Sequence, residues 1–179
     1  MRLSRRARIP GALLLLVVLL GLAYVRGRAG TTGDDVADSS VVRVVDGDTV
    51  VVRLDGVDER VRLIGIDTPE SVDPRTPVEC FGKEASEHAG SLLPPGTAVR
   101  LVRDVEARDR YDRLLAYVYR ADDGLFVNLA MAEAGYADVA TFPPNVAHVD
   151  EFVAAVAAAR AEGRGLWSAC GGPDEPAPP

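Results

Sequence analysis

Four short clusters in the sequence carry side chains whose types suit metal-assisted chemistry on a phosphate. They are Asp46-Gly47-Asp48-Thr49, Arg62, Asp67-Thr68-Pro69-Glu70 and Arg113. Carboxylate and carbonyl oxygens are the ligands that Ca²⁺ and Mg²⁺ prefer in proteins. A further carboxylate can manage an attacking water, and guanidinium groups hold phosphate oxygens through paired hydrogen bonds. Together the clusters predict a site that binds a hard cation and cleaves a phosphodiester.

Each cluster is ambiguous when it is taken alone. Asp-Gly is ordinary turn chemistry, and an acid followed by Thr and Pro often just begins a loop. Arg113 follows a charged turn and could simply be solvated. Arg62 differs, because it stands between Val61 and Leu63 in an otherwise apolar strand. An unpaired charge there would be costly, so Arg62 needs an anionic partner, either a nearby carboxylate or a substrate phosphate.

The strands that must position these residues can be read from the sequence. Residues 41–52 are Val-rich and interrupted by Asp46-Gly47-Asp48, which predicts a strand, a bend and a second strand. Asp55-Gly56 is a hairpin signal, and residues 61–66 form the return strand. Folding this hairpin brings Asp48 opposite residues 63–67, so Asp48 and Asp67 can share a metal.

The remaining elements complete an α+β domain. Alternating residues predict strands at 98–103 and 114–119, and helical spacing predicts helices at 81–93, 127–134 and 149–163. Five strands with one helix before the fourth, followed by two helices, predict a small closed barrel.

The N-terminal segment predicts an export or anchoring signal. Four arginines within residues 1–8 precede an uncharged, apolar stretch of 17 residues at 9–25, close to the roughly 20 of a spanning helix. Because Arg26 and Arg28 follow at once and no small-x-small cleavage site ends the stretch, we favour an uncleaved signal anchor with its N-terminus inside. A cleaved signal peptide and a buried core helix are the alternatives. A signal anchor and a cleaved signal peptide would both place the domain outside the cytoplasm.

Composition divides the chain into four segments. Residues 1–28 form the signal anchor or signal peptide, and residues 29–40, rich in Gly, Thr, Ser and Asp, read as a flexible linker. Residues 41–170 form the folded domain. The Pro- and Gly-rich residues 171–179 read as a disordered tail.

The two cysteines, Cys80 and Cys170, lie near the two ends of this domain. In an oxidising compartment they predict a disulfide, which would close about 90 residues and contribute about 4–5 kcal/mol in the chain-entropy model. Two separate buried thiols are the alternative. With only two isolated histidines, His88 and His148, the chain is poorly suited to a zinc site.

The charge of the chain limits the class of function. After residue 28 there are 14 basic and 27 acidic residues, a net charge of −13. Modules that grip nucleic acid generally present a basic surface, so this composition argues against a general nucleic-acid-binding module. A bound cation and a few placed arginines must instead hold a polyanionic substrate.

Several runs together resemble the staphylococcal nuclease (thermonuclease) family over roughly residues 41–167. They are Val45 to Thr49, Val61 to Glu70, Phe81 to Ala85, Asp109 to Val118 and Val127 to Gly135. The resemblance implies an OB-type barrel of five strands carrying three helices. It also implies calcium-dependent hydrolysis of DNA and RNA, with single strands preferred and 3′-phosphates left on the products.

The resemblance also assigns the site residues. Asp48 and Asp67 are the expected carboxylate ligands of one Ca²⁺, and Thr68 the expected ligand through its backbone carbonyl. Glu70 is the expected general base acting on water, although whether it removes the proton or only orders the water stays open.

Arg62 and Arg113 are expected to bind the scissile phosphate and stabilise its added charge in the transition state. Tyr111 is expected to contact a phosphate or base. The family often places tyrosines after the second helix, where this chain has only Phe142, so base stacking is expected to be reduced.

The sequence therefore predicts a monomeric calcium-dependent nuclease, held at the membrane by its N-terminal helix or secreted. The alternative is a non-catalytic OB-fold module that binds nucleic acid or protein around a structural calcium site.

Overall fold

The computed structural model describes residues 39–72 and 77–177. Its main sheet has five strands in the order β1-β2-β3-β6-β5, and a second sheet pairs β4 with β7. The strands are β1 (Ser39–Val44), β2 (Thr49–Leu54), β3 (Val57–Leu63), β4 (Gly65–Asp67), β5 (Val99–Val102), β6 (Leu114–Arg120) and β7 (Asp138–Ala140). The helices are α2 (Gly82–Leu92), α3 (Val127–Glu133), α4 (Val149–Ala161) and α5 (Leu166–Ala169). The expected α+β class is confirmed; β4, β7 and the short α5 were not predicted.

The main sheet curls until its two edge strands meet. β3 runs parallel to β6, whereas the β1–β2, β2–β3 and β5–β6 pairs are antiparallel. Between the edges, Ser40 and Ala98 form a β-bridge, and the backbone N–H of Val41 donates to Thr97 O at 2.9 Å. The sheet is thus the small closed barrel that the sequence predicted.

The hairpin that carries the acidic clusters forms as expected. Asp55 and Gly56 have φ values of 49° and 82°, as required at both central positions of a type I′ turn. The register pairs Thr49 with Arg62, and Leu63 N donates to Asp48 O at 2.8 Å. Asp48 therefore lies beside the end of β3, just before the chain enters β4 and reaches Asp67.

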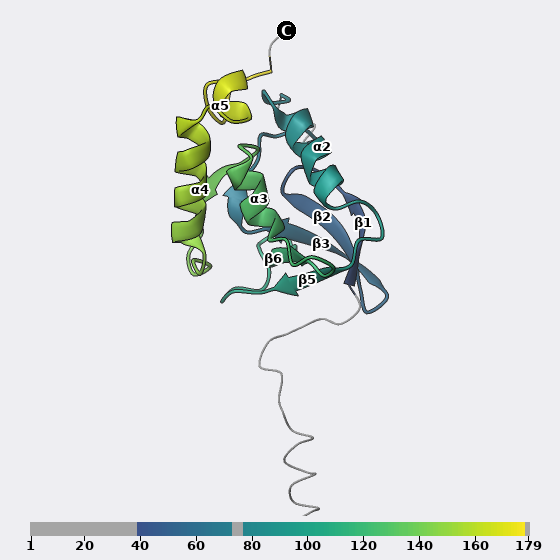
Figure 1. The fold of residues 1–179 in the computed structure, drawn as a ribbon. Coiled ribbons are helices and arrows are strands. Elements are labelled where there is room, and N and C mark those ends of the chain that lie inside the picture. The colour runs from purple at the N-terminus through teal and green to yellow at the C-terminus, as the bar shows by residue number, and fades with distance from the viewer. Residues whose placement is uncertain (1–38, 73–76, 178–179) are drawn as a thin grey trace, which may run out of the picture. The chain divides into compact units, whose positions relative to one another are not determined.

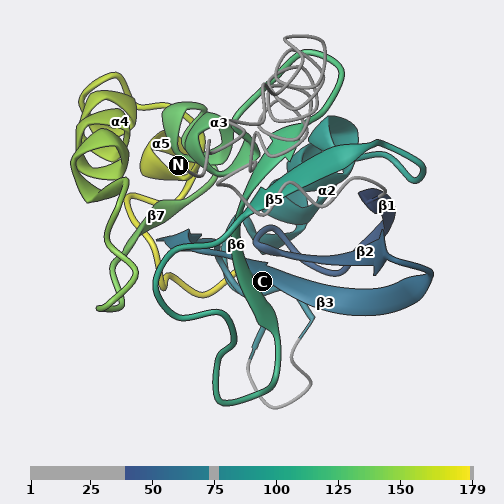
Figure 2. The same ribbon diagram turned by 90° about the horizontal axis from the view of Figure 1, so that it is seen from below.

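The helices cover the barrel in sequence order. Figures 1 and 2 show α2 near the β1–β2 hairpin, α4 and α5 on the far side, and α3 between them. The buried core joins Val52 and Leu63 of the barrel to Ala89 of α2, Met131 of α3 and Phe152 of α4. In α4, Phe152 is buried, whereas the next residue, Val153, is 51% exposed.

Asn128 of α3 fixes the segment between the two halves of the site. Its side chain is fully buried; Nδ2 donates to Ile64 O at 2.9 Å and Oδ1 accepts from Val118 N at 2.9 Å. Buried polar atoms require such partners. The link holds the β3–β4 connection, which lies between Arg62 and Asp67, against β6.

The structure describes only part of the terminal segments that were predicted from the sequence. The signal segment 1–28 and nearly all of the linker 29–40 lie outside the described residues, although Ser39 and Ser40 already belong to β1. Within 39–72 and 77–177, no helix is long and apolar enough to cross a membrane. The C-terminal residues 175–177 are described and pair with residues 78–80, which differs from the disordered tail expected from their composition.

Candidate active site

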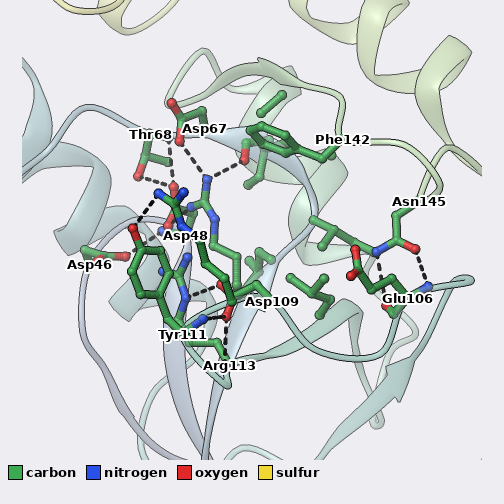
Figure 3. Close-up of a pocket in the computed structure, with 18 of the residues that line it drawn as sticks. Asp46, Asp48, Asp67, Thr68, Glu106, Asp109, Tyr111, Arg113, Phe142 and Asn145 are labelled. Atoms are coloured by element: carbon green, nitrogen blue, oxygen red, sulfur yellow. Dashed lines mark hydrogen bonds and ion pairs between the residues drawn. The ribbon is translucent and has the colours of Figure 1, made fainter.

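A pocket of about 660 Å³ opens where the acidic hairpin end, the loop after β4 and the turn before β6 meet. All of the predicted metal, catalytic and substrate-binding residues line it: Asp48, Arg62, Asp67, Thr68, Glu70, Tyr111 and Arg113. Figure 3 shows most of these side chains pointing into one space from separate segments of the chain. The structure therefore brings together residues that are up to 65 positions apart in sequence.

Asp48 is buried and held on several sides. Its backbone N–H donates to Asp46 Oδ1 at 3.1 Å. Its Oδ2 accepts from the backbone N–H and the hydroxyl of Thr68, at 3.1 and 3.2 Å. Because Thr68 directly follows Asp67, these hydrogen bonds tie the two expected ligand carboxylates to one another.

Arg62 lies between the two carboxylates. Its Nη1 forms an ion pair with Asp48 Oδ1, and its Nη2 donates to Asp67 Oδ1 at 2.6 Å and to Ile66 O at 3.1 Å. The Arg62 side chain is only 13% exposed. Burial lowers the pKa of Arg62, and the charge of Asp67 opposes that shift. The anionic partner that the sequence required for Arg62 is thus a pair of carboxylates.

The same arrangement tests whether the residues suit a hard cation. Asp48 pairs with Nη1 of Arg62 and Asp67 pairs with its Nη2, so the two negative charges converge on a single positive group. Among residues 39–72 and 77–177, no cluster of three or more His, Cys, Asp or Glu side chains is arranged to hold a metal. The two carboxylates and the Thr68 carbonyl are nevertheless oxygen donors, the ligand type that Ca²⁺ prefers, and water would have to complete the set.

Glu70 lies on the loop that leaves β4. Its Oε1 accepts from the backbone N–H groups of Ser71 and Val72, at 2.8 and 2.7 Å. Its own backbone is held by Glu79: Glu70 N donates to Glu79 Oε2 at 2.8 Å, and Glu79 N donates to Glu70 O at 2.9 Å. The candidate base is therefore fixed through its main chain.

Arg113 reaches the pocket from the turn before β6. Its Nε donates to Asp109 Oδ2 at 2.7 Å, and its backbone N–H donates to Asp109 Oδ1 at 3.0 Å. Tyr111, in the same turn, is 63% exposed, and the guanidinium carbons of Arg110 and Arg113 lie 4.7 and 5.5 Å from the centre of its ring. This turn presents an arginine and an aromatic ring to the pocket together.

A second exposed aromatic ring stands on the opposite rim. Phe142 is 72% exposed and precedes the cis bond Pro143–Pro144. Asn145 anchors this segment to the other wall, since Glu106 N donates to Asn145 Oδ1 at 2.7 Å and Asn145 Nδ2 donates to Glu106 O at 3.1 Å. The pocket thus lies between the Tyr111 and Phe142 rings, and the hydrogen bonds between Asn145 and Glu106 hold the Phe142 segment in place.

The sequence analysis placed Asp46 in the first acidic cluster without giving it a role, and it missed the orienting roles of Asp109 and Glu79. Asp46 is a pocket residue whose pKa is raised, mainly by burial and also by the charge of Glu70. Asp109 and Glu79 hold Arg113 and Glu70. Each had a signal only as an acidic residue within a few positions of a turn, which is too common to single it out.

The predicted disulfide is present. Cys80 and Cys170 are bonded, with their Cα atoms 6.0 Å apart. No free cysteine remains, which excludes the alternative of two separate thiols. The bond joins the start of α2 to the end of α5.

The chain is similar to proteins of a known family. The family model for staphylococcal nuclease homologues matches residues 60–169. The chain is 43% identical to the thermonuclease of Staphylococcus intermedius, over 74% of this chain and 80% of that protein. It is 37% identical to the thermonuclease of Staphylococcus hyicus, over 78% and 81%, and 35% identical to endonuclease YncB of Bacillus subtilis, over 72% and 61%. The chain therefore belongs to the staphylococcal nuclease family.

Proposed function

We propose that this protein is a calcium-dependent nuclease that hydrolyses phosphodiester bonds of DNA and RNA outside the cytoplasm. One observation carries the proposal: Asp48 and Asp67 converge on the guanidinium of Arg62, in a pocket that also holds Arg113 and Glu70. Relatives whose names identify them as thermonucleases and endonucleases support the same reaction class.

The residues divide the reaction between them. Asp48, Asp67 and the Thr68 carbonyl would hold Ca²⁺, which when bound supplies a Lewis acid for a phosphoryl oxygen and acidifies coordinated water. Arg62 and Arg113 would offer planar paired donors to the remaining phosphate oxygens, and Arg62 would do so by giving up contacts that it makes here with Asp48 and Asp67. They stabilise the extra negative charge as water attacks phosphorus, and such preorganised donors are commonly worth about 3–4 kcal/mol each.

Glu70 completes the proposed reaction by accepting a proton from the attacking water. The bond from phosphorus to the 5′ oxygen then breaks, the 5′ oxygen takes up a proton, and the product carries a 3′-phosphate. The exposed rims at Tyr111 and Phe142 suit unstacked bases, which supports a preference for single strands. The disulfide suits an oxidising compartment outside the cytoplasm.

Digestion of single-stranded DNA and RNA by the purified, oxidised protein tests the proposal. We expect cleavage in Ca²⁺ and none in EGTA, with 3′-phosphate ends that block extension until a phosphatase removes them. Glu70→Gln and Arg113→Ala should each lower kcat by about 100-fold or more. Binding of DNA in calcium without cleavage by the folded wild type would contradict the proposal and favour the non-catalytic binding module.

A further inference from the structure

Residues 78–80 lie between Glu70 and the C-terminal residues 175–177, and hydrogen bonds join these three segments into a short ladder. On one side, Glu79 exchanges hydrogen bonds with Glu70: its N–H donates to Glu70 O, and its Oε2 accepts from Glu70 N. Because β-like backbone alternates the direction of its N–H groups, the neighbouring residues Val78 and Cys80 face the opposite side. There they meet the C-terminal segment.

The C-terminal segment, residues 175–177, forms the outer layer of this ladder. Cys80 N donates to Glu175 O at 2.7 Å and Ala177 N donates to Val78 O at 3.2 Å, which makes Glu79 and Pro176 an antiparallel bridge. The disulfide from Cys80 to Cys170 joins the same two segments five residues before Glu175. The disulfide and two backbone hydrogen bonds therefore fix residues 78–80, the segment whose Glu79 hydrogen-bonds to Glu70.

The segment after Cys80 packs against the same backbone. Phe81 has φ 70°, and Gly82 lies so close to the loop that a Cβ atom on it would meet Glu70 O at 2.5 Å. Gly82 N also donates to Glu79 O at 3.1 Å, closing the turn into α2. Residues 79–82 thus fit the Glu70 backbone closely, and a shift of this turn would be transmitted to Glu70.

We propose that Glu79 is a positioning residue for Glu70, and that the Cys80–Cys170 disulfide and residues 175–177 keep Glu79 in place. This inference rests on the proposed function, in which Glu70 acts on the attacking water. It makes turnover depend on a covalent bond remote from the chemistry. Cation binding does not depend on that bond, since Asp48 and Asp67 make their described contacts with Arg62 and Thr68 and not with this strand.

Substitutions at Glu79 test the positioning role directly. Glu79→Ala removes the acceptor for Glu70 N, and we expect kcat to fall about 10- to 100-fold, as misplacement by about 1 Å can cost 10²-fold. KM and the Ca²⁺ dissociation constant, measured by calorimetry, should change less than about threefold. Glu79→Gln keeps a carbonyl oxygen as acceptor and should restore most of kcat.

A matched control comes from Asp123, a carboxylate outside the pocket that also accepts from a backbone N–H, that of Leu125, at 3.1 Å. Asp123→Ala should leave kcat unchanged. Equal losses of kcat in Glu79→Ala and Glu79→Gln, or no loss in either, would overturn the positioning role.

Two further variants test whether the disulfide and residues 175–177 keep Glu79 in place. The double variant Cys80→Ser/Cys170→Ser and a chain lacking residues 173–179 should both lower kcat with unchanged Ca²⁺ affinity. Reductant should lower kcat of the wild type and leave the double variant unaffected. If the double variant fails to fold, the effect of reductant on the wild type decides the role of the disulfide, and the shortened chain decides the role of residues 175–177.

The two proposals fail in distinguishable ways. Oxidised wild type that does not cut in calcium contradicts the proposed nuclease. Wild type that cuts, beside folded disulfide-free and shortened variants that cut within about twofold of it, leaves the nuclease standing and overturns the role of the disulfide and tail.

Discussion

The carboxylate of Asp109 fixes both the main chain and the side chain of Arg113. One oxygen accepts from the backbone N–H groups of Arg113 and Tyr111, at 3.0 and 2.9 Å, while the other accepts from Arg113 Nε at 2.7 Å. Arg113 also lines the pocket, so this ion pair holds its guanidinium group at the pocket wall. Asp109 therefore presets the direction from which Arg113 can approach a phosphate.

Replacing Asp109 should consequently impair Arg113 without removing it. In Asp109→Ala the guanidinium loses its orienting partner, and we expect kcat/KM to fall about 10- to 100-fold. Steady-state cleavage of a short single-stranded DNA gives the measurement. In a double-mutant cycle with Arg113→Ala, the second substitution should add little. Full additivity of the two losses would show that Asp109 does not act through Arg113.

Asp109 also makes a prediction about pH. Partial burial opposes ionisation, but the hydrogen bonds from Arg113 outweigh it and hold the pKa of Asp109 below its usual value of 3.8. A carboxyl whose folded pKa is depressed stabilises the fold above its unfolded pKa, and this stabilisation is lost as pH falls through the folded pKa.

Urea unfolding of the wild type and of Asp109→Asn at several pH values checks this expectation. The difference in free energy of unfolding should stay constant from pH 7 to about pH 5 and shrink only near and below pH 4. A difference that disappears between pH 7 and pH 5 would assign the effect to a group of higher pKa.

Part of this site could be predicted from the sequence because it depends on features of short sequence segments. The Asp55-Gly56 turn fixes the hairpin register, and that register brings Asp48 beside the end of β3, after which the chain reaches Asp67. The need of Arg62 for an anionic partner followed from its apolar neighbours. Such inferences rest on period, turn chemistry and the cost of an unpaired charge.

The remainder depends on contacts that no local pattern encodes. A tail rich in Pro and Gly gave no sign that Glu175 and Ala177 would pair with the strand behind Glu70. Nor could one acidic residue among 27 be singled out as the partner of Arg113. Side-chain roles of this kind come from tertiary packing, where chemically ordinary residues gain a specific partner.

Gly47 separates the two aspartates of the first acidic cluster and lies against Thr68. A Cβ atom at Gly47 would lie 2.6 Å from Thr68 Oγ1 and 2.8 Å from Thr68 Cβ. Gly47→Ala must therefore displace Thr68, which hydrogen-bonds to Asp48 and follows Asp67. We expect the Ca²⁺ dissociation constant, measured by calorimetry, to rise about 10-fold, equivalent to about 1.4 kcal/mol.

Gly90 supplies the control for that substitution. It lies within α2, and a Cβ atom there would meet nothing within 4 Å. Gly90→Ala should raise stability by about 0.5–1 kcal/mol with unchanged Ca²⁺ affinity. Unchanged affinity in Gly47→Ala as well would show that Thr68 is not part of the cation site.

The two exposed rings on the pocket rims, Tyr111 and Phe142, make the last prediction. Both rings are exposed and line the pocket, and base stacking on one ring contributes about 1–3 kcal/mol. Tyr111→Ala and Phe142→Ala should each raise KM for single-stranded DNA about 5- to 100-fold, with kcat less affected.

Val105 is exposed to a similar degree, 71%, but does not line the pocket, so Val105→Ala should leave KM unchanged. The KM of a substrate of only two nucleotides should respond to substitution of one ring more than of the other. The rings stand on opposite rims and cannot both stack on the same base. Losses in kcat alone, with KM constant for both variants, would instead place the rings in the structure of the arginine turn and the Phe142 segment, and not in contact with the bases.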